Sequence, residues 1–129
     1  MSDSGKVLIV DDEPSLLKMM SVYLARRGYD VATAGTTEKA WEDFEAAPGT
    51  YSVVVLDATM TGVPMNELAE RMLRASGTLR VLTASGYPVD MSALAAIAPG
   101  RVEFLHKPFS PEMLAAAVRR MLGPQEENV

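Results

Sequence analysis

Several polar side chains of this sequence stand directly after short apolar runs, and together their types could support chemistry. They are Asp11, Asp12, Glu13, Asp57, Ser85 and Lys107. Carboxylates that are packed together repel one another and titrate as a coupled group, so they need a counter-charge at neutral pH. One lysine is insufficient, whereas a hard divalent cation with oxygen ligands, Mg²⁺ or Mn²⁺, suits such a cluster.

A carboxylate beside such a cation can attack phosphorus as a nucleophile and form an aspartyl phosphate. The cation and Lys107 would neutralise charge on the phosphoryl oxygens in an in-line transition state. Ser85 could donate a hydrogen bond to a further oxygen. Phosphoryl transfer to Asp57 is therefore the chemistry open to these residues, provided that the fold brings them together.

Short β-branched and apolar segments indicate strands that are buried on both faces of a sheet. The expected strands are residues 6–10, 29–34, 51–56, 79–84 and 101–105. Helical patterns separate them, and the first helix is expected from Pro14, at a first-turn position, to Gly28. The other helices are expected from Thr36 to Pro48, around Leu68–Leu73 as far as Gly77, from Asp90 to Pro99, and from Ser110 to Gly123.

Strands that alternate with helices predict an α/β fold, in which helices cover both faces of a parallel sheet. The length of 129 residues suits a single domain. Ligands of open α/β sheets bind beyond the carboxyl ends of the strands. Because each of the polar residues named above follows a strand, we expect them to converge on one edge of the sheet.

Four segments at these strand ends resemble the response-regulator receiver family. They are residues 7–14 (VLIVDDEP), 55–57 (VLD), 81–87 (VLTASGY) and 104–109 (FLHKPF). The resemblance covers residues 5–122 and implies a flavodoxin-like, doubly wound sheet of order 2-1-3-4-5 with five helices. It predicts a stand-alone receiver domain, with residues 1–4 and 123–129 as flexible tails.

By this resemblance, Asp57 is the phosphoacceptor and also a metal ligand. Asp12 resembles a direct ligand of the Mg²⁺ or Mn²⁺ ion, and Asp11 a ligand through water. The backbone carbonyl of Thr59 completes the metal set. Lys107 resembles the lysine that pairs with the phosphoryl group.

The resemblance also implies a cis peptide bond before Pro108, and a switch pair formed by Ser85 and Phe104 that moves on phosphorylation. Thr83 is the alternative switch hydroxyl, since it also precedes an alanine. We favour Ser85 because this alignment matches a Ser-Gly-Tyr variant of the family. It also keeps Arg80 out of the middle of the strand.

The loop after Asp57 departs from the family pattern. Thr61 stands where members usually carry proline, and Met65 stands where they usually carry glycine. Loss of the proline loosens the loop by about 0.5–1 kcal/mol. Met65 requires an ordinary negative φ. We therefore expect the departure from the family to affect the geometry of this loop, but not the chemistry.

The amino-acid composition limits the classes of partner that the protein could bind. A net charge of −5 and a pI of about 4.8 argue against direct nucleic-acid binding. No apolar run approaches the roughly 18 residues of a membrane span. The resemblance implies a histidine kinase or a histidine phosphotransfer protein as donor, and an unidentified protein downstream. We expect a cytoplasmic monomer or weak dimer, and no turnover enzyme.

Four alternatives stay open at this point. Residues 53–61 resemble the nucleophile motif of haloacid-dehalogenase phosphatases, but Thr59 stands where those enzymes need a second acid. A nucleotide-binding module would need glycines in the turn after the first strand, where residues 11–13 are acidic. A receiver-like protein could also act without phosphorylation. The single histidine, His106, could carry phosphate, but we expect it to point away from the site.

Overall fold

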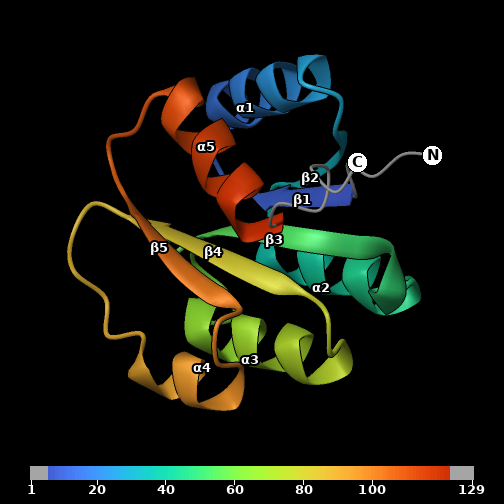
Figure 1. Ribbon diagram of the computed structural model, residues 1–129, viewed down its shortest axis with the longest axis vertical. Helices are drawn as coiled ribbons and strands as arrows, with labels where there is room; N and C mark the ends of the chain where they lie inside the picture. The colour runs from blue at the N-terminus through green and yellow to red at the C-terminus, as the bar shows by residue number, and fades with distance from the viewer. Residues whose placement is uncertain (1–5, 123–129) are drawn as a thin grey trace.

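The computed structural model describes residues 6–122, which form one parallel sheet between two layers of helices (Figure 1). The strands are β1 (Lys6–Val10), β2 (Asp30–Ala34), β3 (Tyr51–Asp57), β4 (Arg80–Ser85) and β5 (Val102–His106). The helices are α1 (Pro14–Arg26), α2 (Thr37–Ala46), α3 (Met65–Ala75), α4 (Ser92–Ile97) and α5 (Pro111–Leu122), with a 3₁₀ turn η1 (Pro48–Thr50) before β3.

The five strands lie in the order β2-β1-β3-β4-β5, and every neighbouring pair is parallel. This confirms the predicted fold class and strand order. Every residue of β3 except Ser52 is buried, and its run from Val53 to Leu56 is apolar throughout, as expected for a strand covered on both faces. None of the helices among residues 6–122 is long and apolar enough to cross a membrane.

Two apolar cores lie on opposite faces of the sheet, because successive strand residues point to opposite sides. Val7 and Ile9 of β1 belong to the core under α1 and α5. Leu8 and Val10 belong to the core shared with α2, α3 and α4. Figure 1 shows these two helical layers on either side of the sheet. The layers leave the carboxyl ends of the strands as the edge at which loops meet.

Local signals fix the ends of several helices as the sequence predicts. Pro14 occupies the first turn of α1, and Gly28 follows that helix with a φ of 98°. The Thr36 hydroxyl caps α2 by accepting a hydrogen bond from the Lys39 amide. The Ser110 hydroxyl accepts one from the Met113 amide, 3.1 Å away, at the start of α5.

Some boundaries differ from the expected ones. β4 and β5 each begin and end one residue later, and β2 begins at Asp30. The Leu79 carbonyl accepts a hydrogen bond from the Arg101 guanidinium (3.0 Å), so both residues are engaged just before their strands begin. Asp90 lies two residues before α4, and its carboxylate accepts from the Ser92 amide (2.9 Å). The predicted tails, 1–4 and 123–129, lie outside the described residues.

Candidate functional site

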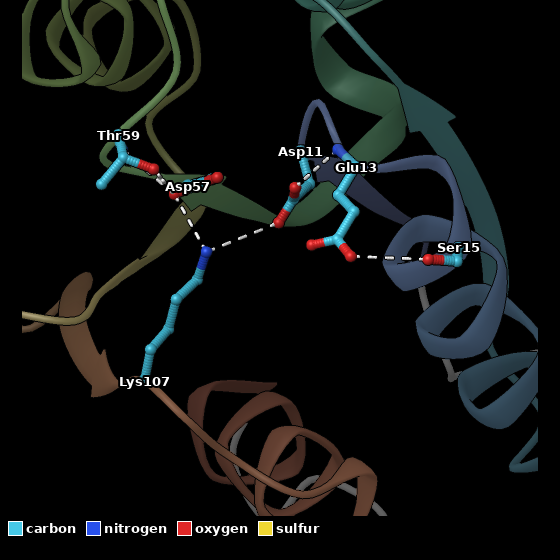
Figure 2. Close-up of polar contacts among 6 residues, drawn as sticks. All are labelled: Asp11, Glu13, Ser15, Asp57, Thr59 and Lys107. Atoms are coloured by element: carbon cyan, nitrogen blue, oxygen red, sulfur yellow. Dashed lines mark hydrogen bonds and ion pairs between the residues drawn. The ribbon is translucent and has the colours of Figure 1, made fainter.

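The carboxyl ends of β1, β3 and β5 bring Asp11, Asp57 and Lys107 together, although they are far apart in the sequence (Figure 2). The Lys107 Nζ atom lies 3.2 Å from Asp57 Oδ1 and 3.8 Å from Asp11 Oδ2. The predicted convergence of these three residues at one edge of the sheet is therefore confirmed.

Burial sets the electrostatics of this cluster. Asp11 and Asp57 are 4% and 5% exposed, whereas Asp12 is exposed to solvent. Two carboxylates are thus removed from most of the water that would screen them, and Lys107 supplies their one nearby ammonium among the described residues. Such a cluster retains a net negative charge and attracts a further cation.

The two oxygens of Asp57 have different surroundings. Oδ1 accepts hydrogen bonds from the Thr59 amide (3.0 Å) and the Thr59 hydroxyl (2.9 Å), and it also faces Lys107. No hydrogen bond reaches Oδ2 from any residue between 6 and 122. The carboxylate is therefore held by one oxygen, while the other is available to an incoming group.

The surroundings of Asp11 disfavour its ionised form. Burial raises its pKa above the usual aspartate value, and the neighbouring charges of Asp57 and Asp12 act in the same direction. The Glu13 amide, which donates to Asp11 Oδ1 at 3.0 Å, and the Lys107 ammonium lower that pKa without cancelling the rise. Asp11 would gain from a further positive charge nearby.

Three carboxylates form a group suited to a cation. One oxygen from each of Asp11, Asp12 and Asp57 lies within 4.8 Å of the others. Oxygen donors of this kind are the ligands that Mg²⁺ and Mn²⁺ prefer. Glu13 does not join them, because its side chain accepts a hydrogen bond from the Ser15 hydroxyl at the start of α1 (Figure 2).

Ser85 and Thr83 are both fully buried on β4, but at different distances along the strand from Asp57. The ladder pairs Asp57 with Ala84, so Ser85 lies one residue toward the carboxyl edge and Thr83 one residue away from it. The Ser85 hydroxyl accepts from the Tyr87 amide (3.1 Å). The arrangement favours Ser85 as the hydroxyl near the site. Arg80 begins the strand and is nonetheless half-buried.

Phe104 lies in the middle of β5, and Lys107 directly follows the end of that strand. Phe104 is half-buried, pairs with Thr83 in the ladder, and packs edge-on against the exposed His106, with ring centroids 6.1 Å apart. The Lys107 amide donates to the Ser85 carbonyl (2.8 Å), which ties the lysine to the end of β4. The bond between Lys107 and Pro108 is cis, as the resemblance implies.

One residue at this edge was missed by sequence reasoning. Thr37 is 3% exposed, and its hydroxyl accepts a hydrogen bond from the Val63 amide (3.0 Å) in the loop after Asp57. Its only sequence signal was its place beside Thr36, at the expected start of a helix. Met65 begins α3, and like all non-glycine residues from 6 to 122 it has no positive φ.

Comparison with known proteins matches residues 7–119 to the response regulator receiver domain family. The chain is 32% identical to the sensor kinase CckA of Brucella abortus over 126 residues, which are 98% of this chain and 13% of that protein. It is 28% identical over 124 residues to the DNA-binding response regulator MtrA of Mycolicibacterium smegmatis, covering 95% of this chain and 53% of MtrA.

Among solved structures, the response regulator TrrA of Thermotoga maritima, in complex with Mg²⁺-BeF, has a TM-score of 0.75 and 27% identity. That match covers 91% of this chain and 98% of TrrA. The chain spans about half, or less, of the length of the two curated relatives above. Because the family match extends over most of the described residues and agrees with the fold, the chain belongs to the response regulator receiver domain family of two-component signalling.

Proposed function

We propose that Asp57 accepts a phosphoryl group from a histidine kinase or a histidine phosphotransfer protein. Accepting a phosphoryl group is the general function of receiver domains. For this chain, one observation carries the assignment to Asp57. It is a buried carboxylate with one oxygen held by Thr59 and Lys107 and the other without a hydrogen bond among the described residues.

In the proposed step, a bond forms between an Asp57 carboxylate oxygen and phosphorus. The bond between phosphorus and the donor's leaving atom breaks, and the leaving group takes the electron pair. For a phosphohistidine donor whose other ring nitrogen carries a proton, the leaving group is the neutral imidazole of that histidine. Lys107 lies within reach of the carboxylate and would neutralise charge on a phosphoryl oxygen, while Ser85 would donate to another. Holding Asp57 through Oδ1 reduces the rearrangement needed before attack.

Receiver domains bind Mg²⁺ at an acidic pocket, and the cluster here fits that ion. Asp12 would bind the metal directly, Asp11 through water, and Asp57 and the Thr59 carbonyl would complete the set. When bound, Mg²⁺ or Mn²⁺ supplies positive charge to the phosphoryl oxygens. The raised pKa of Asp11 supports this proposal, since a site that disfavours its own anion gains from a bound cation.

Intact mass measurement tests the acceptor. Acetyl phosphate or phosphoramidate with Mg²⁺ should add one acid-labile phosphoryl group to the chain and none to Asp57→Ala. Asp43→Asn serves as a control, because this carboxylate is on the surface of α2 and pairs only with Lys39 among the described residues. It should be phosphorylated like the unchanged chain. No mass gain, or an undiminished gain in Asp57→Ala, would refute the proposal.

Thermal unfolding tests the metal site. Binding to the folded state adds RT ln(1 + [L]/Kd), about 1.4 kcal/mol at ten times Kd. Millimolar Mg²⁺ should therefore raise Tm for the unchanged chain but not for Asp12→Ala, whose fold should remain intact. An unmoved Tm would mean that the carboxylates do not form the metal site.

The phosphorylated domain would transmit its signal by binding another protein. We propose that a phosphorylation-dependent change around Ser85 and Phe104 alters the surface presented to an unidentified downstream protein. Receiver domains are signalling domains, and we propose no turnover on an external substrate. The stand-alone state stays a prediction, and the mass of the protein isolated from its natural source would test it.

A further inference from the structure

The loop between β3 and α3 is joined to α2 by a buried hydroxyl. The Val63 amide donates to Thr37 Oγ1 at 3.0 Å, across 26 positions of the chain. Thr37 is 3% exposed, so water has little access to replace this bond. An amide that loses its acceptor where water has little access carries a desolvation cost. The bond therefore holds the loop more firmly than an exposed contact of the same length would.

Gly62 brings the loop close to this hydroxyl. A Cβ atom at Gly62 would lie 2.5 Å from Thr37 Oγ1, which is closer than real Cβ contacts. Gly62 also has a φ of 100°, a conformation that other residues rarely adopt. Two adjacent residues of the loop, 62 and 63, thus lie directly against the first residue of α2.

The same loop carries the groups that hold Asp57. The amide and hydroxyl of Thr59 both donate to Asp57 Oδ1, at 3.0 and 2.9 Å. Residues 60–62 alone separate Thr59 from the amide that Thr37 holds. The loop lacks a proline at Thr61 that would stiffen it, so its position depends on this contact with α2.

We propose that Thr37 is a positioning residue for phosphorylation: by holding Val63 through its hydroxyl, it keeps Thr59 in place against Asp57. This inference rests on the proposed function. Between residues 6 and 122 no hydrogen bond or ion pair joins Thr37 to Asp57, so Thr37 acts through the loop.

Rates of phosphorylation by phosphoramidate with Mg²⁺ test the role. Thr37→Val keeps the shape but removes the acceptor, and it should slow phosphorylation about tenfold. Thr37→Ser keeps the oxygen and should stay within about twofold of the unchanged chain. Thr36→Val is the matched control. It removes a neighbouring threonine hydroxyl that accepts from the Lys39 amide and makes no bond to the loop.

Amide hydrogen exchange supplies a readout that does not depend on the reaction. Exchange at Val63 and Thr59 should accelerate in Thr37→Val and stay unchanged in Thr36→Val and Thr37→Ser. If Thr37→Val folds poorly, Thr37→Ala removes the same acceptor with a smaller side chain. Equal rates in Thr37→Val and the unchanged chain, or equal slowing in Thr36→Val, would overturn the inference. No phosphorylation of the unchanged chain would instead overturn the proposed function.

Discussion

Lys107 lies between two buried carboxylates, and because they are buried, its ion pairs with them contribute strongly to the free energy of unfolding. Lys107→Ala would leave Asp11 and Asp57 facing each other without their shared ammonium. We expect the free energy of unfolding at pH 7 without metal to fall by about 1–3 kcal/mol. Lys107→Ala should also accept a phosphoryl group more slowly and lose the coupling of phosphorylation to partner binding. Urea unfolding and phosphorylation assays measure the two effects.

Lys39→Ala is the matched control for this prediction. Its Nζ atom lies 2.8 Å from Asp43, closer than Lys107 lies to either of its partners, but the pair is on the surface of α2. Exposed pairs of this kind contribute little to stability, because water and salt screen the two charges. A larger loss for Lys39→Ala than for Lys107→Ala would contradict the argument that burial outweighs distance.

The raised pKa of Asp11 predicts how the free energy of unfolding depends on pH. Because burial raises this pKa in the folded state, the unfolded chain loses its proton first as the pH rises. Ionisation of Asp11 therefore lowers the free energy of unfolding above the usual aspartate pKa of about 3.9, and the loss is complete above the raised value.

Asp11→Asn should remove this loss, since the amide keeps an acceptor for the Glu13 amide and carries no charge. We expect the variant to be more stable than the unchanged chain by about 1 kcal/mol at pH 7 without metal, and to have no advantage near about pH 3. Urea unfolding at the two pH values measures it. An advantage of equal size at both would show that charge is not the cause.

At the scale of elements, regular structure was predictable and the loop after Asp57 was not. The strands and helices follow from apolar runs and from local residues such as Pro14 and Gly28, so their ends shifted by only a residue or two. The position of the loop depends on the bond between Thr37 and Val63. No local pattern encodes a contact between residues so far apart, and the sequence indicated only that Thr37 stands at the start of a helix.

Comparing Gly62→Ala, in the loop after Asp57, with Gly100→Ala, between α4 and β5, separates the cost of backbone strain from the cost of steric crowding. Both glycines have positive φ, which costs an alanine about 1–2 kcal/mol. An added Cβ meets nothing within 4 Å at Gly100 but would collide with Thr37 at Gly62. Gly62→Ala should therefore destabilise the fold by at least about 1 kcal/mol more in urea unfolding. Equal losses would mean that the loop moves aside without cost.

At the scale of the whole molecule, the site was predictable because its position follows from topology. Parallel strands place their carboxyl ends on one edge, so Asp11, Asp57 and Lys107 had to meet once the alternation of strands and helices was recognised. The side-chain directions did not follow in the same way. Glu13 turns toward Ser15, away from the acidic cluster. Partner identity depends on surfaces that the residue pattern does not specify.

The face formed by α4, β5 and α5 is the part of the molecule best placed to change with the site. α4 has 6 residues, of which only Leu94 is buried. The buried Thr83 hydroxyl lies 3.4 Å from the sulfur of Met91, the residue before this helix, and 3.4 Å from the Glu103 carbonyl. Few anchors allow an element to move at low cost. Glu103, in turn, is joined to α5 by an ion pair with Arg120 (2.8 Å).

Beryllofluoride, which mimics a phosphoryl group, should therefore change amide chemical shifts well beyond Asp57. We propose that Ser85 moves toward a phosphoryl oxygen and that the ring of Phe104 turns inward into the space it leaves, away from His106. Beryllofluoride shifts the equilibrium between the resting and the changed conformation only in so far as it binds the changed conformation more tightly. We expect shifts across residues 85–106 in the unchanged chain with Mg²⁺, and none in Asp57→Ala. Shifts confined to the neighbours of Asp57 would mean that this face does not respond to phosphorylation.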